Sequence, residues 1–214
     1  MTRVIITRLM WAGLVGIVLG SVSAALGQTN LIKNGSFERP VAPYRGYRLF
    51  STGNTFSHWQ VVGDSGSVDV INGTFTTPPV FSFPAQAGSQ WLDLTGDSNT
   101  ATGVAQKVAT TPNAAYTLTF YVGNMYDPHG GLGVSSTVNV LIDGQQVYQA
   151  TNSGGKVRTA LTWQKFTTTI VAASSQTTIA FMNGDPPSDN VNGLDAITLV
   201  PQGSATGRRI SLFH

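Results

Sequence analysis

The sequence predicts an all-β protein folded as a jelly-roll β-sandwich. Some dozen short segments alternate apolar and polar residues, and Gly, Pro, Asn and Asp separate these segments. We find no convincing amphipathic helix after the first 27 residues, and no segment repeats at a fixed period. Many short strands joined by polar turns are typical of sandwiches and jelly rolls.

The first residues predict a secretory signal peptide over 1–27. Arg3 and Arg8 precede an apolar run from Leu9 to Leu19, and Val22-Ser23-Ala24 fits a small-residue cleavage site. That run is too short for a membrane span. We therefore expect a secreted or cell-surface protein without a membrane span in its mature chain. Residues 28–201 should form one β-sandwich domain, and 202–214 a disordered tail.

The composition argues against nucleic acid as a partner and excludes disulfides as a source of stability. The chain has 12 basic and 10 acidic residues, and two of the basic ones lie in the leader, so the mature chain is nearly neutral. Its one remaining basic pair is Arg208-Arg209, which argues against nucleic acid as a partner. The absence of cysteine excludes disulfides, so an exported form must depend on its core or on a metal ion.

In the first half we expect a short strand with an Asn-Gly turn at Asn30–Glu38, followed by a long loop at 39–56 with room for one short strand. Segments 58–63 and 67–72 should be the two arms of a hairpin. The segment Thr74–Gly88 contains three prolines and cannot be a central strand. We expect it to cover one face or one end of the sandwich.

In the second half the alternation is clearest at Ala115–Val122, where Tyr116, Leu118 and Phe120 face one side. Asp143-Gly144 supplies the turn of a hairpin. Loops are expected at 95–102, 124–134 and 185–192. The remaining strands are expected at 89–94, 103–109, 137–142, 145–150, 163–171, 177–183 and 193–200, with 163–171 and 177–183 paired to each other.

The first and last strands are expected to lie side by side and to close the sandwich. Leu194 and Ala196 should then face one side of the last strand, with Asp195 and Ile197 on the other. This arrangement brings Glu38 close to Asp195. Two neighbouring carboxylates need a cation or a basic side chain between them.

Several motifs occur in the order found in one group of extracellular proteins. The chain resembles secreted DUF642-like and choice-of-anchor C proteins, and it is similar to carbohydrate-binding modules with the same domain. The resemblance implies a jelly-roll β-sandwich that is galactose-binding-domain-like. The matching segments are Asn30–Glu38, Trp59–Ile71, Ala87–Gly96, Gln106, Tyr116–Phe120 and Leu194–Leu199.

The resemblance also implies a structural Ca²⁺ ion where the first and last strands meet. Glu38 and Asp195 would be its ligands, helped by backbone oxygens near Asn34 and Ser36, since calcium prefers hard oxygen ligands. Alternatively, Glu38 pairs with a neighbouring basic residue and Asp195 caps a turn. No cluster of His and Cys supports a zinc site.

The expected function is non-catalytic attachment to an extracellular or cell-wall polysaccharide. Sugars stack on aromatic rings and bind polar side chains through their hydroxyl groups. Trp59, Trp91 and Trp163 lie in predicted strands, which favours the core over the ligand. The candidate ligand-binding residues are Tyr47, Arg45, Tyr121, Tyr126 and His129.

Two other functions stay open. One is a structural or adhesive matrix protein without a sugar site. The other is a weak glycan-active hydrolase, which needs two carboxylates facing one substrate; Asp64, Asp69, Asp93 and Asp127 are the residues that could pair. The segment Gly63–Gly66 looks like a serine-protease nucleophile loop, but it is already expected as a turn and the mature chain has few histidines. We therefore do not expect an enzyme.

Overall fold

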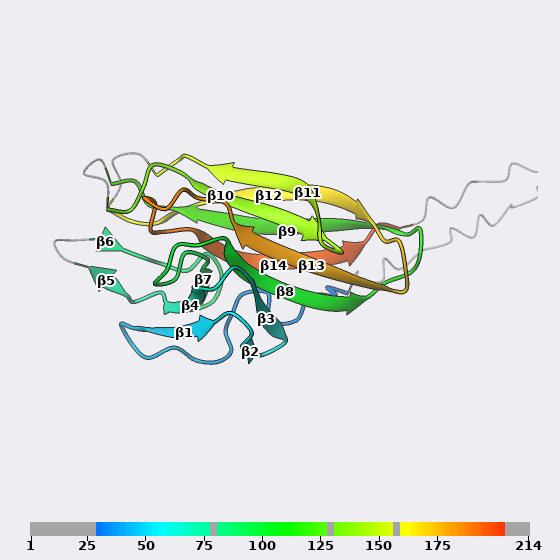
Figure 1. Ribbon diagram of the computed structural model, residues 1–214, viewed down its shortest axis with the longest axis horizontal. Helices are drawn as coiled ribbons and strands as arrows, with labels where there is room; N and C mark the ends of the chain where they lie inside the picture. Colours follow the sequence, from blue (N-terminus) through cyan, green and yellow to red (C-terminus); the bar gives the residue numbers. More distant parts are fainter. Residues whose placement is uncertain (1–28, 78–80, 128–130, 156–158, 204–214) are drawn as a thin grey trace, which may run out of the picture.

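The computed structural model describes residues 29–77, 81–127, 131–155 and 159–203, which form two facing six-stranded antiparallel sheets (Figure 1). Sheet A contains, in spatial order, β1 (Tyr47–Ser51), β4 (Ser67–Asn72), β7 (Gln90–Asp93), β14 (Gly193–Pro201), β9 (Ala115–Asn124) and β12 (Thr162–Val171). Sheet B contains β11 (Gln145–Asn152), β10 (Ser136–Ile142), β13 (Gln176–Asn183), β8 (Thr102–Ala109), β3 (Trp59–Gly63) and β2 (Thr55–Phe56). The predicted all-β sandwich is confirmed.

Two very short strands, β5 (Thr76–Thr77) and β6 (Phe81–Ser82), form a separate ribbon. They belong to the proline-containing segment that was expected to cover part of the sandwich. The described residues include no helix that could cross a membrane. The predicted signal peptide, the tail from residue 204 and His129 lie outside the described residues.

The main core lies between the two sheets. Along a regular strand, every second side chain points into it. In β9, Tyr116, Leu118 and Phe120 are buried there, as their alternation predicted. The predicted hairpin at Asp143-Gly144 is also confirmed, because β10 and β11 pair and both turn residues have positive φ angles of 48° and 84°.

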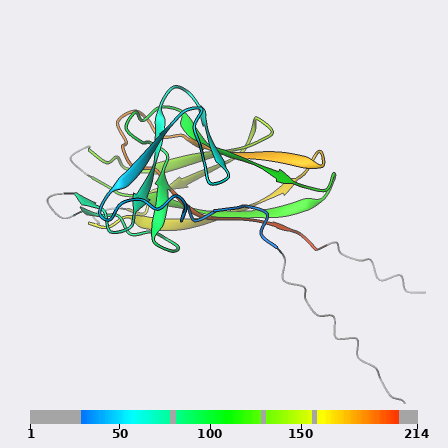
Figure 2. The same cartoon turned by 90° about the horizontal axis from the view of Figure 1, so that it is seen from below.

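The beginning and the end of the described chain lie side by side (Figure 2). Leu31 N donates to Leu199 O at 2.8 Å, and Ile197 N donates to Gly35 O at 3.0 Å. The Asn30 side chain bridges the two segments, since its Oδ1 accepts a bond from Leu199 N at 2.8 Å. The expected first strand is wrong in detail, because residues 30–38 form bends and a turn along β14.

The strict alternation predicted for the last strand is also wrong. The register of β14 against β9 shifts between Asp195 and Thr198, and Ala196 has a φ of +51°. This bulge adds a residue on one side, so Leu194, Ile197 and Leu199 all face the core. Asp195 therefore points away from the core, toward the segment that covers sheet A.

Two predicted hairpins are wrong for one physical reason. The strands β3 and β4 lie in different sheets, and so do β12 and β13. Each of these strands contributes side chains to the core, for example Val61 from β3 and Val70 from β4. Such strands face each other across the core, so the turns Gly63–Gly66 and 172–175 cross from one sheet to the other.

We expect Asn30→Ala to destabilise the fold by about 1–3 kcal/mol, because it leaves Leu199 N without its acceptor. The measurement is urea unfolding followed by far-UV circular dichroism. Gln146→Ala is the control, since Gln146 is exposed on β11. Equal midpoints for the two variants would contradict a closing role for this bond.

Candidate functional site

A second hydrophobic cluster lies on the outer face of sheet A, away from the main core. In β4 and β7, Val70 and Leu92 point into the core, whereas Ile71 and Trp91 point outward. The outward side chains are nevertheless buried. The cluster contains Ile71, Phe83, Trp91, Met125, Leu161 and Val191, with Phe75, Phe81, Ala85, Leu132 and Trp163 packed against it.

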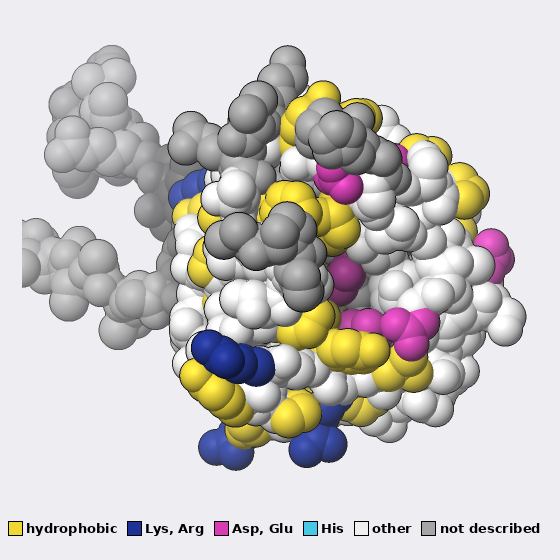
Figure 3. Space-filling model, turned by 90° about the vertical axis from the view of Figure 1, so that its left-hand side faces the viewer, with side chains coloured by type: hydrophobic (Ala, Val, Ile, Leu, Met, Phe, Trp, Pro, Cys, Tyr) yellow, Lys and Arg dark blue, Asp and Glu magenta, His cyan; other side chains and the backbone are white. Residues whose placement is uncertain are grey.

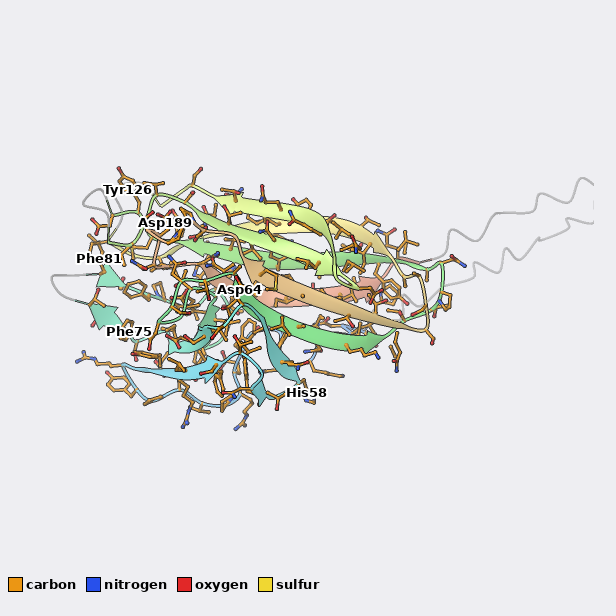
Figure 4. The ribbon with its side chains drawn as sticks, viewed as in Figure 1. His58, Asp64, Phe75, Phe81, Tyr126 and Asp189 are labelled. Carbon is orange, nitrogen blue, oxygen red and sulfur yellow. The ribbon has the colours of Figure 1, made fainter. Side chains whose placement is uncertain are left out.

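The segments 73–77 and 81–90, which we call the cover, enclose this cluster. Trp91 Nε1 donates to Phe83 O and Trp163 Nε1 donates to Pro84 O, each at 2.9 Å. Phe75 and Phe81 from the cover lie at one end of the sandwich, with Tyr126 and Asp189 from two loops beside them (Figure 4). The expectation that this segment covers one face or one end is therefore confirmed.

A cavity of about 160 Å³ opens where the cover, sheet A and the loops before β10 and β14 meet. Most of its wall is apolar or aromatic, but carboxylates line one side. Figure 3 shows acidic side chains in a hollow at this end, next to hydrophobic ones. The lining residues are Tyr47, Asp69, Ile71, Phe75, Thr77, Phe83, Trp91, Asp93, Asp97, Leu132, Asn190 and Val191.

Asp69 and Asp93 occupy directly opposite positions on the neighbouring strands β4 and β7. They are only 5% and 8% exposed. Burial, and after it the nearby carboxylates of Asp93 and Asp97, raise the pKa of Asp69 to about 7. Asp69 Oδ1 is buried without a hydrogen-bond partner, and Asp69 is one of the residues that line the cavity.

Asp93 differs from Asp69 because the backbone holds it firmly. Its Oδ1 accepts bonds from Thr95 N, Thr95 Oγ1 and Asn192 N, at 3.0, 2.8 and 3.1 Å. Burial raises the pKa of Asp93, these bonds lower it and the Asp97 carboxylate raises it, which leaves a pKa of about 6. The two carboxyl groups therefore differ in how the backbone holds them.

Buried amides hold the loop that supplies Asn190 and Val191 to the cavity. Asn99 Nδ2 donates to Pro186 O and Asp189 O, and Asn192 Nδ2 donates to Asn183 Oδ1. This network ties the loop before β14 to the loop after β7. Asp185 in the same loop also has a pKa raised by burial, to about 8.

Glu38 and Asp195 lie close enough for Glu38 to raise the pKa of Asp195, after the larger effect of burial. Asp195 Oδ2 accepts bonds from Gln86 N and Ala87 N, both at 2.9 Å. Glu38 Oε1 accepts bonds from Ser89 N and Gln90 N, at 2.8 and 3.0 Å. We call this pair the carboxylate clamp, because it fixes the end of the cover.

The predicted calcium site fits the clamp in part. Glu38 and Asp195 retain lone pairs for a cation, since each carboxylate has about four acceptor sites. Asn34 does not fit, because its backbone oxygen accepts bonds from Phe37 N and Trp59 Nε1 and its side chain binds the Arg39 backbone. Ser36 lies in the same turn. No cluster of three or more metal-binding side chains occurs among the described residues.

The structure does not gather the predicted sugar-binding residues at one place. Tyr47 lines the cavity, with its ring 42% exposed at the mouth. Tyr126 lines a separate surface cleft with Asp189. Tyr121 lies on the outer face of sheet A opposite Lys165 in β12, and Arg45 lies over the ring of Tyr44. Of the carboxylates proposed for the hydrolase alternative, Asp69 and Asp93 do lie together.

The sequence interpretation missed most of the cavity wall, including Phe75, Phe83, Leu132 and Val191. Trp91 was expected in the core, and it is buried, but its cluster is the one under the cover. The signal that could have shown the site is the two-sided apolar pattern of β4 and β7. A strand with apolar residues on both faces must be covered on both.

The sequence model of one protein family matches residues 28–185, which is most of the chain; the family is HpiC1-like, described as HpiC1 cyclase. The chain belongs to the HpiC1-like family. Its fold is similar to that of a cyclase from Fischerella sp. TAU, at 18% identity and a TM-score of 0.53, covering 80% of this chain and 95% of the cyclase. No curated protein matches the sequence.

The fold is also similar to the CBM22-1 xylan-binding domain of Paenibacillus barcinonensis Xyn10C. The identity is 17% and the TM-score 0.48, covering 83% of this chain and 97% of that domain. Kinship with DUF642 or choice-of-anchor C proteins receives no support. The expectation of a non-catalytic protein was wrong, because the matched family is one of cyclases.

We expect Asp69→Asn to flatten the dependence of stability on pH. Between the ordinary pKa of 3.8 and about 7, folded Asp69 keeps a proton that the unfolded chain releases. Wild-type stability should therefore fall as pH rises through this range. Over this pH range the free energy of unfolding should fall by about 2 kcal/mol less in the variant than in the wild type, after allowance for partial solvent screening.

The measurement is urea unfolding of both proteins at about pH 5 and about pH 8, which lie below and above the pKa of Asp69. Asp64→Asn is the matched control, because Asp64 is an exposed aspartate in the turn before β4. If Asp69→Asn and wild type lose the same stability between the two pH values, Asp69 is already charged at pH 5.

A calcium ion at the carboxylate clamp stays a proposal, and its test is thermal. Chelator should lower the melting temperature, and added calcium should restore it, because the ion would offset the repulsion between Glu38 and Asp195. Glu38→Gln should weaken this response. An unchanged melting temperature in chelator would count against the ion.

Proposed function

We propose that the protein catalyses an acid-initiated cyclisation of an apolar, unsaturated substrate in the cavity under the cover. The observation that carries the proposal is Asp69, which lines an aromatic-walled cavity and whose buried carboxyl group has an Oδ1 without a hydrogen-bond partner. Membership of a cyclase family supports the reaction class. The Asp69 carboxyl group and the aromatic wall of the cavity support a mechanism that begins with proton transfer to the substrate.

Asp69 is suited to donate a proton at neutral pH. Its pKa of about 7 leaves a large fraction protonated, whereas an ordinary aspartic acid would be almost fully charged. The surrounding apolar wall favours the neutral form. A proton on Oδ1 or Oδ2 is therefore held beside the space that a substrate would occupy.

Asp93 is suited to accept the proton at the end. Its pKa of about 6 leaves it mostly ionised at pH 7, and its bonds to Thr95 and Asn192 fix its orientation. Two neighbouring groups with separated pKa values are the usual arrangement of an acid and a base in one site. Their titrations are coupled, so the pair acts as one unit.

The reaction balances without an external reagent. A carbon–carbon double bond of the substrate takes the proton of Asp69, which leaves a carbocation on the neighbouring carbon. A second double bond or an aromatic ring attacks that carbon and forms the new carbon–carbon bond. Asp93 then removes a proton, and a double bond forms again. The product is an isomer of the substrate.

The cavity wall supports the charged intermediate. The rings of Phe75, Phe83 and Trp91 line the cavity, and an aromatic face attracts a cation within about 6 Å. The same rings reduce access of water, which would otherwise trap the carbocation. At about 160 Å³ the cavity is smaller than a typical ligand pocket, so it would hold the reacting part of the substrate.

Binding to a polysaccharide and export from the cell stay predictions. The likeness to the xylan-binding domain concerns the fold, and the residues proposed for sugar contact do not converge on one site. A purely structural role would not explain the buried carboxyl pair in the cavity. Burying these groups costs free energy, and Asp69 Oδ1 makes no hydrogen bond that would offset the cost.

We expect Asp69→Asn to lower the cyclisation rate by about 10²–10⁴-fold, because an amide cannot donate an acidic proton. Asp93→Asn should lower it as well, and Asp64→Asn should leave it unchanged. The measurement is conversion of a panel of unsaturated aromatic compounds to isomers of equal mass, followed by chromatography and mass spectrometry.

The same reaction in D₂O provides a second readout. The wild-type product should gain one deuterium from Asp69 at the protonated carbon. A product without deuterium would overturn the proton-transfer mechanism, even if the protein cyclised its substrate. Full activity in Asp69→Asn would exclude Asp69 as the acid.

A further inference from the structure

The segment 39–49, which we call the arginine face, is basic and unusually apolar for an exposed surface. It carries Arg39, Arg45 and Arg48, all exposed. Between them lie the exposed apolar side chains of Val41, Tyr44, Tyr47 and Leu49, with Tyr44 73% exposed. Figure 3 shows Lys and Arg side chains along the lower border of this end, beside hydrophobic ones.

No acidic residue of the same segment balances the charge of this face, although Asp69, Asp93 and Asp97 line the adjoining cavity that Tyr47 shares. No acidic residue occurs from Arg39 to Gly63. Glu38, directly before it, is engaged with Ser89 N and Gln90 N in the carboxylate clamp. Three of the six Lys and Arg residues in the described part of the chain lie on this face, although acidic residues outnumber basic ones there; the six are Lys33, Arg39, Arg45, Arg48, Lys107 and Lys165.

The arginine side chains are held outward by contacts that leave their charges free. Arg48 Nε donates to Val41 O at 2.7 Å, and Arg45 lies 5.5 Å from the centre of the Tyr44 ring. A backbone carbonyl and an aromatic ring both leave the positive charge unneutralised. An anionic partner would therefore be attracted by the charges of Arg45 and Arg48.

The arginine face is continuous with the mouth of the cavity. Tyr47 belongs to both, and its ring meets the Phe75 ring edge-on at 6.0 Å. Arg45 N donates to Thr74 Oγ1 at 3.0 Å, which ties the face to the cover. Whatever binds the arginine face therefore lies directly beside the entrance.

We propose that the arginine face docks on a membrane surface that contains anionic lipid, with the mouth of the cavity turned toward the lipid. Aromatic and aliphatic side chains enter the headgroup region, while arginines bind the phosphates and extend along the surface. An anionic polysaccharide would use the arginines but would leave Val41 and Leu49 exposed to water.

Docking places the cavity where an apolar substrate is concentrated. This consequence rests on the proposed function, because it requires the cavity to take an apolar molecule. The docking itself does not, since it depends only on the arginine face. The two proposals can therefore fail separately.

The test is co-sedimentation of residues 28–214, the mature chain predicted from the sequence, with vesicles and without any substrate. Vesicles of phosphatidylcholine mixed with phosphatidylserine should bind the protein, and vesicles of phosphatidylcholine alone should bind it at least tenfold more weakly, at about 1 kcal/mol per arginine. Added salt should release the protein. Asp69→Asn, which lacks the proposed acid, should bind the mixed vesicles as wild type does.

The double variant Tyr44→Ser, Arg45→Glu should weaken binding to the mixed vesicles by about tenfold or more. Lys165→Glu, an equal charge reversal on β12, should have little effect. A melting temperature close to wild type shows that the double variant is folded, and Arg39→Glu provides an independent change on the same face.

Three outcomes would overturn the proposal. The first is equal binding to both kinds of vesicle, or binding to neither. The second is an equal loss of binding in Lys165→Glu and in the double variant. The third is binding to polygalacturonate but not to mixed vesicles, which would identify an anionic polysaccharide as the partner.

Discussion

The carboxylate clamp is the constraint on which the rest of the site depends. Glu38 comes from the beginning of the domain and Asp195 from its last strand, and the two meet because the end segments lie together. Four backbone N–H groups of residues 86–90 donate to them. Charge-assisted bonds of this kind are stronger than neutral ones. They hold the cover against sheet A, and without the cover the aromatic cluster would face water.

The bulge at Ala196 makes this clamp possible. Without the extra residue, Asp195 and Ile197 would point to the same side of β14. The bulge instead turns Ile197 into the core while Asp195 reaches the cover. A single irregularity therefore serves two layers of the structure: it completes the main core and fixes the wall of the cavity.

Much of the fold could be predicted from the sequence, because alternation and turn residues act locally. The strand β9 and the Asp143-Gly144 hairpin are examples. Which strands pair was harder to predict. Neighbouring strands such as β3 and β4 have the same local pattern whether they pair or face each other across a core.

The candidate site was predicted less well than the fold. Asp69 and Asp93 could be named as residues that might pair, but their pairing depends on the register between β4 and β7. Phe75 and Leu132 reach the cavity from loops whose positions no local pattern specifies. Resemblance to sugar-binding sandwiches directed attention to exposed tyrosines, whereas the buried carboxyl pair lies beneath a segment that was expected to cover the sandwich but not to enclose a cavity.

The position of the cavity outside the main core has an evolutionary consequence. Side chains such as Phe75 and Leu132 belong to the outer cluster, so changes in them leave the packing between the sheets intact. Proteins with this scaffold can therefore vary the shape of the chamber at little risk to folding. The chamber and the architecture that supports it can change independently of each other.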